Sequence, residues 1–483
     1  MSPRGRVPIA PVSAGRWRVV SGLSAGVLAL GVSTSTWADV PTPKRMTLTE
    51  AIDASLVSSP VVKIAAAGIS AQESKVSATR ALLFPRLRVE GNVFVWNDKL
   101  PLSLGPQAAQ PAQPAQSSTI SAPAAPVAGA EEQVIREQVT ASLSITAVEP
   151  ITGLYAITRL IALEEAGLDA GIADQETARL DTAQRVAQAY FGLLSARALT
   201  EVAEKSLSQV EAQHARARVL ESAGVLGRVD LLRLDSVRES VKQGLLLARM
   251  GRDLASRGLV LAIGAPLDQV LEPVDDFPDP PPSFELPESG VRELAEHRSE
   301  LVAARARLEQ ARGGTDVAKA ALFPSIVAIA SYQHTEGQSS IFTPADTFFG
   351  GATLTWDVFE WGRTMHTIDE AGERARQAEL GVSALENQIR FDVERRLLEA
   401  KTASDTLSAA RAGLVAAEEA HRIQSVRFEQ GAATTTDVID AETDLARARS
   451  QSATARYNYY LSLANAARAL GRLPEVTSKE IRP

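Results

Sequence analysis

The chain of 483 residues contains no cysteine. Disulfide bonds, thiolate metal sites, a cysteine nucleophile and a lipid-modified N-terminal cysteine are therefore all excluded. Any attachment of this protein to a membrane must come from the fold itself.

Signals of catalysis are also missing from the sequence. It has no HExxH or GxSxG motif and no phosphate-binding loop. The five histidines show no metal-ligand spacing, and each is interpreted as a surface or strand histidine: His214, His297, His334, His366 and His421. We therefore predict a protein that is not an enzyme and that has no cofactor or metal site.

Long apolar runs are confined to the first 38 residues. Four arginines precede an apolar run from Val19 to Val32, and small residues follow up to Ala38. This pattern predicts a signal peptide over 1–38, with cleavage after Ala38. A membrane anchor is the alternative, but the run of about 14 residues is shorter than the roughly 20 that a spanning helix needs. No later run predicts a spanning helix, so insertion into a membrane would require a β-barrel.

Positive charge is scarce in the mature chain. Removal of the signal peptide takes four of the 50 basic residues and none of the 58 acidic ones, so 46 against 58 gives a net charge of −12. An acidic secreted chain is not expected to bind nucleic acid.

The sequence does contain an internal repeat. Gly224, Asp230 and Gly264 recur 207 positions later as Gly431, Asp437 and Gly471, without a gap. We therefore divide the chain into a first repeat at 39–264, a proline-rich linker at 265–290, a second repeat at 291–471 and a C-terminal tail at 472–483.

In the first repeat, Thr47 and Glu50 form a capping pattern for a helix over 46–83, in which Pro60 marks a kink or a second start. Period-two alternation then predicts half-buried strands from Arg86 and around 139–147, the second one closed by Pro150. Between them, 101–130 is rich in Pro, Ala and Gln and predicts an extracellular low-complexity loop. A helix over 151–221, a reversal at 223–229 and a helix ending at Gly264 complete the repeat.

The second repeat follows the same plan. It predicts a helix from about Val291, strands at 325–334 and 348–359 around a loop at 335–347, and a long helix at 363–429. Gly431 then ends this helix, and Thr436 with Asp437 starts the last one. The motif LFP ends at Pro85 and again at Pro324, 239 positions apart, whereas the second strands are offset by 211. The difference matches a loop insertion at 101–130.

Four strands of about ten residues suit a tilted bilayer span, but four cannot close a barrel. Two chains would give eight strands and three would give twelve; a barrel of eight is filled by its own side chains, so three chains are favoured. Six aromatic residues in and near the predicted strands could form interfacial belts or belong to a sheet core: Phe94, Trp96, Phe348, Phe349, Trp356 and Trp361.

The long helix of the second repeat carries an apolar seam at spacings of three and four. Its members are Val382, Leu385, Ile389, Val393, Ala400, Ala403, Leu407, Ala410, Leu414 and Ala417. Such a seam predicts coiled-coil packing, and the alanines allow close approach of the helices. The seam alone does not distinguish a tunnel wall from another coiled coil.

Together these features resemble the TolC family of outer-membrane efflux proteins. The doubled plan, the two LFP motifs, the sequences EPITG and FEWGR, and RYNYYLSLANAARALG after the second reversal carry the resemblance. It implies an α+β membrane protein, with four strands per chain in a trimeric 12-stranded β-barrel continued by a long antiparallel α-helical coiled-coil tunnel. It also implies the outer membrane and periplasm of a Gram-negative cell as the location.

The resemblance further implies an exit duct of a tripartite efflux or type I secretion system, with a periplasmic adaptor and an inner-membrane pump as partners. A secreted coiled-coil envelope spacer or adhesin without a pore is the alternative. It would explain the helices but not four alternating strands. The cargo and the particular pump and adaptor are not predicted.

By the resemblance, the periplasmic gate falls on Asp437, Asp440 and Phe428, with Phe428 in place of a family tyrosine and Ala433 in place of an arginine. Asp437 and Asp440 share a helix face at i and i+3, and three chains would place six carboxylates around one constriction. Their repulsion is expected to raise some pKa values and to attract cations, and Arg233 is a possible local counter-ion. The plainer alternative is that Asp437 is an N-cap and Asp440 a first-turn acid.

The resemblance also assigns adaptor docking to the two reversals. The residues concerned are Gly224, Val225, Leu226, Gly227, Gly431 and Ala432. A plain helical hairpin would require the same glycines.

Overall fold

The computed structural model describes residues 44–102, 133–275, 277–278, 298–339 and 344–474, all in one compact unit. The predicted signal peptide and most of the predicted loop at 101–130 lie outside the described residues. In chain order the elements are β1 (Lys44–Met46), α1 (Leu48–Ser58), α2 (Pro60–Ala81), β2 (Arg86–Val95), β3 (Leu100–Leu102), β4 (Gln133–Pro150), α3 (Gly153–Ser222), α4 (Arg228–Ile263), β5 (Leu271–Pro273), α6 (Ser299–Ala320), β6 (Ser325–Gln338), β7 (Asp346–Thr355), α7 (Arg363–Glu429) and α8 (Thr435–Ala469).

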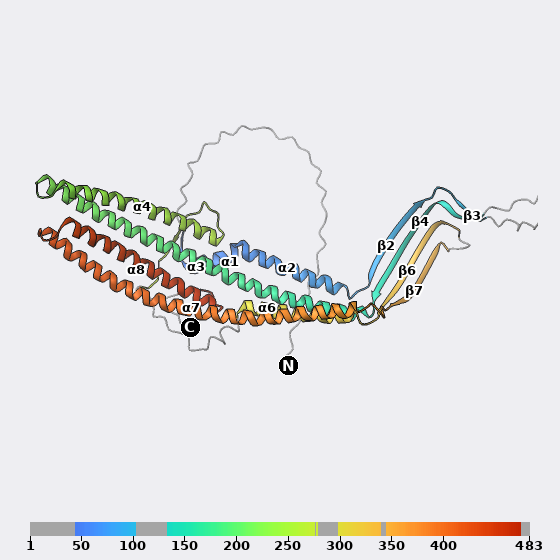
Figure 1. Ribbon diagram of the computed structural model, residues 1–483. Coiled ribbons are helices and arrows are strands. Elements are labelled where there is room, and N and C mark those ends of the chain that lie inside the picture. The colour runs from blue at the N-terminus through green and yellow to red at the C-terminus, as the bar shows by residue number, and fades with distance from the viewer. Residues whose placement is uncertain (1–43, 103–132, 276, 279–297, 340–343, 475–483) are drawn as a thin grey trace, which may run out of the picture. The chain divides into compact units, whose positions relative to one another are not determined.

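The duplication predicted from the sequence is visible in the helices (Figure 1). α2 and α6 both have 22 residues, α3 and α7 have 70 and 67, and α4 and α8 have 36 and 35. Each repeat therefore runs from a short helix through a strand pair, a long helix and a reversal to a second shorter helix.

The start of the first repeat resolves the two possibilities at Pro60. Thr47 and Glu50 form the predicted capping box, and Pro60 is the first residue of α2, where its missing N–H has no cost. Among the described residues no single helix is long and apolar enough to cross a membrane, although α1 and α2 pass that test as a pair bent by 43°. In the second repeat α6 begins at Ser299, and the predicted start near Val291 lies outside the described residues.

The four long strands form one antiparallel sheet in the order β2-β4-β6-β7, with β3 added beside β4. Period-two alternation gives the sheet two different faces. One row across it joins Val89, Ile145, Tyr332 and Phe348. The adjacent row, on the opposite face, joins Glu90, Ser144, Gln333 and Thr347. We call these the apolar face and the polar face.

Several strand predictions need correction. β6 continues to Gln338 and β7 ends at Thr355, so the connecting loop is shorter than predicted and 356–359 are not strand. β2 was expected to be half-buried, yet every residue in it is exposed, because a single chain offers nothing to cover either face. Phe94 and Trp96 lie on the polar side, where the Trp96 indole donates to Thr140 Oγ1 at 3.1 Å. They are therefore not part of a belt on the apolar face.

The helices form a layer in which each short helix lies beside a long one. Toward the reversals the order is α4-α3-α8-α7, and toward the sheet it is α2-α3-α6-α7. The two shorter helices of each repeat thus follow one another along the length of a long helix (Figure 1). α7 forms one edge of this layer, and α2 with α4 forms the other.

The main apolar core lies where the shorter helices meet along α3. It includes Ala183, Val186, Tyr190, Phe191, Leu259 and Tyr460. The stretch predicted as a linker contributes β5, which pairs in parallel with β1, and Phe277, which packs into this core. The predicted seam of α7 is buried over Ile389, Val393, Ala400 and Leu407.

Candidate functional site

The two reversals, which we call tip 1 and tip 2, have the same backbone geometry. Gly224 in tip 1 and Gly431 in tip 2 adopt positive φ values of 75° and 73°. In tip 1 the Val225 N–H donates to Leu220 O at 2.9 Å, and in tip 2 the N–H of Ala432 makes the equivalent bond at 2.8 Å. A side chain would meet no atom within 4 Å at either glycine, so backbone conformation explains these residues rather than space.

The helix that leaves each tip begins differently. α4 starts after Gly227, which offers no side-chain cap, whereas α8 starts after Thr434 with a full capping box. The Asp437 carboxylate accepts from the Thr434 N–H and hydroxyl, both at 2.8 Å, and the Asp437 N–H donates to Thr434 Oγ1 at 3.2 Å. Asp437 is therefore the third helical residue rather than the N-cap, and α8 begins one residue before the predicted Thr436.

The predicted gate carboxylates are both exposed on α8, one turn apart. Hydrogen bonds from the backbone and then the side chain of Thr434 lower the pKa of Asp437, and the nearby charge of Arg427 acts in the same direction. The expected rise concerns the carboxylates of three chains around one constriction, so it stays a prediction. Asp440 lies in the second turn of α8, not in the first.

The other predicted gate residues are placed as follows. Phe428 and Ala433 are half-buried beside tip 2. Arg233 lies 3.7 Å from Asp230 in its own helix, and no described ion pair joins it to Asp440. The i,i+3 acid Asp230 is its partner within one chain, and a counter-ion role of Arg233 at a gate formed by three chains stays a prediction.

Helices α3 and α4 form one hairpin and α7 and α8 form the other. Two polar contacts near the tips join these hairpins to each other, and sequence reasoning missed both. Arg216 Nη1 of α3 lies 3.3 Å from Glu429 Oε1 of α7. Further from the tips, Arg449 of α8 donates to Gln209 Oε1 of α3 at 3.0 Å. The two residues of each pair are more than 200 positions apart, and no repeat or local motif marks them.

Each hairpin also contains a histidine paired with an acid. His214 Nε2 lies 2.9 Å from Asp235 Oδ1, and His421 Nε2 lies 2.8 Å from Glu442 Oε2. Both pairs are related by the same offset of 207 positions, a signal that could have revealed them. The interpretation of these two histidines as surface residues is wrong, because both side chains are mostly buried between helices.

Glu442 is the most buried of these four groups. Burial raises its pKa above the ordinary value, and the charges of His421 and Arg449 act in the opposite direction. Of the remaining histidines, His334 lies in β6 and His366 is exposed on α7, as predicted, while His297 lies outside the described residues.

The fold and the paired tips define a class of protein in which a duplicated chain supplies an amphipathic sheet at one end and two helical hairpins at the other. The outer membrane efflux protein family model matches residues 290–472. OprJ of Pseudomonas aeruginosa is 27% identical over 64% of this chain and 65% of its own length. TtgC of Pseudomonas putida is 23% identical over 88% of this chain and 82% of its own.

Solved structures show the same fold. CusC aligns over 91% of this chain and 95% of its own with a TM-score of 0.74 and 18% identity. VceC of Vibrio cholerae aligns over 89% and 97% with a TM-score of 0.70 and 19% identity.

The chain is a member of the outer membrane efflux protein family, the TolC-like outer membrane factors. Its location is the outer membrane, with an extension into the periplasm, and its role is that of an efflux channel. Its relatives are channel proteins rather than enzymes. The alternative of a spacer or adhesin without a pore gains no support.

Proposed function

We propose that three copies of this chain form the exit duct of a tripartite pump, which receives cargo from an inner-membrane pump and a periplasmic adaptor. The observation that carries this proposal is that both layers of the chain end in open edges. β2 and β7 each pair with only one strand in the described chain, and the helical layer ends at α7 and at α2 with α4.

Open strand edges are not stable in a bilayer, so β7 of one copy must pair with β2 of another. These are different surfaces, so the copies join head to tail and close into a ring. Three copies supply twelve long strands, enough to leave an open lumen lined by the polar face.

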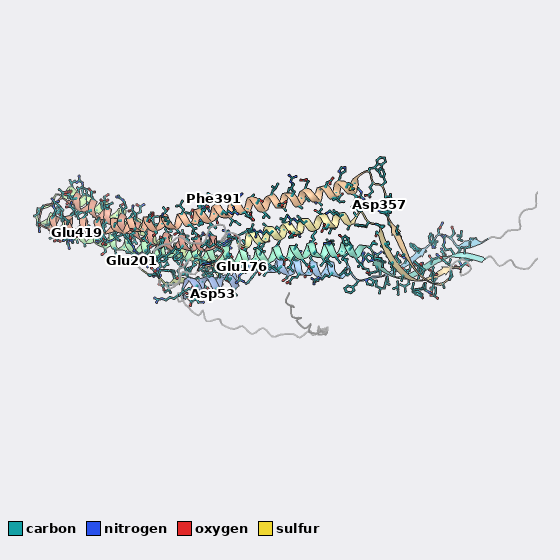
Figure 2. The ribbon with its side chains drawn as sticks, turned by 90° about the horizontal axis from the view of Figure 1, so that it is seen from below. Asp53, Glu176, Glu201, Asp357, Phe391 and Glu419 are labelled. Atoms are coloured by element: carbon teal, nitrogen blue, oxygen red, sulfur yellow. The ribbon has the colours of Figure 1, made fainter. Side chains whose placement is uncertain are left out.

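The edge helices carry apolar surface that supports the same assembly. On α4 an exposed stripe consists of Leu247, Met250, Leu254 and Leu261. α7 exposes Leu380, Phe391 and Leu398, and Figure 2 shows Phe391 midway along this helix. Contact between α7 of one copy and the edge formed by α2 and α4 of the next would remove both stripes from water and close the helical layer into a tunnel.

We place the gate at the tips of this tunnel. Three copies would bring Asp437 and Asp440 into a ring of six carboxylates that attracts cations. Repulsion between copies would oppose the lowering of the Asp437 pKa that Thr434 causes within a chain. Arg216 and Glu429 would act as a latch that holds the two hairpins of one chain together, in the region where Phe428 and Ala433 depart from the family pattern.

The tips themselves are the proposed adaptor-docking surface. Val225, Gly431 and Ala432 are exposed there, and the two tips repeat one backbone geometry. An adaptor hairpin could therefore meet two similar surfaces per chain and six per trimer.

Small organic compounds are the cargo class that the relatives favour over polypeptides. In P. putida, TtgC is described as a toluene efflux pump outer membrane protein, and OpmQ of P. aeruginosa as a pyoverdine export outer membrane protein. We extend this class, though no particular compound, to the present chain. We also propose that the protein has no catalytic activity of its own.

The test combines mass and conductance. Light scattering of the detergent-solubilised protein should give a trimer, and a monomer or dimer would contradict the ring.

In a planar bilayer, Asp437→Ala with Asp440→Ala should raise conductance and weaken block by divalent cations, because the acidic ring is gone. Asp444→Ala is the matched control, since it removes an exposed acid from the same helix next to the proposed ring. An equal effect of the control would contradict the gate, and absence of any conductance would contradict the channel.

A further inference from the structure

The polar face of the sheet carries an excess of positive charge in an acidic protein. Its charged residues in the described strands are Arg86, Arg88 and Glu90 of β2 and Arg136 of β4. Arg88 and Glu90 lie 3.2 Å apart and neutralise each other. Two arginines per chain therefore remain without a counter-charge on this face.

Arg136 has an unusual setting. Its guanidinium carbon lies 3.8 Å from the centroid of the Trp96 ring, which makes a close cation–π stack. Trp96 is held by its indole bond to Thr140 and by its backbone N–H, which donates to Gln138 O at 2.7 Å. Phe94 extends the aromatic surface, with its ring centroid 5.9 Å from that of Trp96.

No described carboxylate pairs with Arg136, and its Nε atom is buried without a hydrogen-bond partner. An arginine held flat on an aromatic ring, with donors left over, offers a planar fork for an oxyanion. The adjacent acid is not available on this face, because Glu137 projects to the other side and lies 2.8 Å from Lys99.

The Arg136–Trp96 stack lies where cargo would make its last contact with the duct before release. Arg136 is opposite Leu100 of β3, at the end of the sheet that is farthest from the helices (Figure 1). Asp437 and Asp440 lie at the opposite end of the helical layer. In the assembled duct the two ends would then differ in charge, acidic at the tips and basic in the sheet.

We infer that the Arg136–Trp96 stack is a binding site for aromatic organic anions, and that it selects anionic cargo at the sheet end of the duct. The inference rests on the proposed function, because the polar face must line the lumen. The guanidinium bonds the carboxylate or similar oxyanion of the cargo, while Trp96 and Phe94 contact its ring. In a trimer three such sites would face the same lumen.

The test uses the full-length trimer in a planar bilayer, in the background of Asp437→Ala with Asp440→Ala so that the acidic tips do not dominate selectivity. The probe is benzoate, measured as block of the potassium chloride current, together with the reversal potential in a salt gradient. Arg136→Gln should weaken benzoate block by about tenfold, the low end for a lost bond to a charged group, and should lower chloride permeability. Arg136→Lys should keep the chloride permeability but lose most of the benzoate block, because ammonium cannot form the planar fork.

The matched control is Lys99→Gln, which removes a cation from the same end of the sheet on the opposite face. If Arg136→Gln leaves block and reversal potential unchanged while the pore conducts, the site is refuted and the proposed function stands. If Lys99→Gln weakens block as much as Arg136→Gln, the block depends on the general positive potential at this end of the sheet and not on a local site. The inference would then also be wrong. A background protein that inserts but does not conduct would instead refute the proposed function.

Discussion

The two repeats join their shorter helices in different ways, although the fold of each is nearly the same. The LFP offset of 239 makes Ser59 and Arg298 equivalent, and each is the N-cap of its helix. In the first repeat the junction is made of small residues, since Ser58 Oγ donates to Ile263 O and Gly264 lies against the Ser59 backbone. In the second repeat it is made of charges.

The charged junction is a network that links four helices. Arg468 of α8 lies 2.6 Å from Asp181 of α3 and 2.6 Å from Glu300 of α6. Arg298 lies 2.6 Å from Glu300 and 3.2 Å from Asp392 of α7. The comparison shows that one backbone geometry accepts either direct backbone contact or long side chains that fill a wider gap.

The network should respond most strongly when one partner is removed. Arg468→Ala leaves Glu300 and Asp181 without their cation, and should lower the free energy of unfolding by ~3–5 kcal/mol. Leu261→Ala is the matched control, because it is the first-repeat equivalent by the offset of 207 and its side chain is exposed. Denaturant unfolding in detergent measures both variants, and equal losses would show that the network adds nothing specific.

The same network should lose its effect in acid. Burial alone would raise the pKa of Glu300, but hydrogen bonds and charges from Arg298 and Arg468 lower it to about 2. A lowered folded-state pKa means that this stabilisation is present above the ordinary value of 4.5 and fades as pH falls toward 2. The loss of unfolding free energy caused by Arg468→Ala should therefore be smaller at pH 3 than at pH 5. The reduction should be roughly the part of that loss that depends on the negative charge of Glu300.

Substitution of the glycines that follow α4 and α8 should also affect the two junctions differently, with a smaller change in the free energy of unfolding. Gly264 and Gly471 have φ values of 79° and 75°, so an alanine costs about 1–2 kcal/mol at either position. At Gly264 the new Cβ would also lie 3.3 Å from the Ser59 Cα, whereas at Gly471 it would meet nothing within 4 Å. Gly264→Ala should thus lower the melting temperature more than Gly471→Ala, and the reverse order would contradict the close backbone contact.

The histidine–acid pairs allow a similar comparison between hairpins. The Glu442 side chain is 6% exposed and the Asp235 side chain 39%. Because burial raises the pKa of Glu442, the folded state is favoured below the ordinary value of 4.5 and loses that advantage as pH rises through the raised value. Glu442→Gln should stabilise the protein near pH 8 relative to the native chain and should have little effect near pH 4. Melting temperatures across this range test it, and an equal difference between the variant and the native chain at pH 4 and pH 8 would contradict it.

The smallest expected effect belongs to the latch between hairpins. Arg216 and Glu429 are both exposed, so Arg216→Gln should change stability by only ~0–1 kcal/mol. It should still raise the resting conductance slightly, because the tips separate more easily. Arg218→Gln, on the same helix and also exposed, is the control; an identical conductance change in both variants would exclude a specific latch.

Much of the fold could be predicted because its signals are local. The capping box of Thr47 and Glu50, the glycine reversals at 224 and 431, and the alternation from Arg86 onward each depend on residues within a few positions of one another. The duplication strengthened every one of these predictions, since a pattern seen in one repeat could be checked in the other. The predictions from local sequence were wrong at the boundaries of elements, such as the start of α8 at Thr435 and the end of β7 at Thr355.

The sequence by itself determined the repeat, the long helices, the two-faced strands and the tips, because period and turn chemistry are written in neighbouring residues. Only the tertiary structure decided the strand order, the Arg468 network, the Arg216–Glu429 contact and the stack of Arg136 on Trp96. These contacts join elements tens to hundreds of positions apart. Their partners are selected by the packing of whole helices and strands, and no short stretch of sequence encodes that packing.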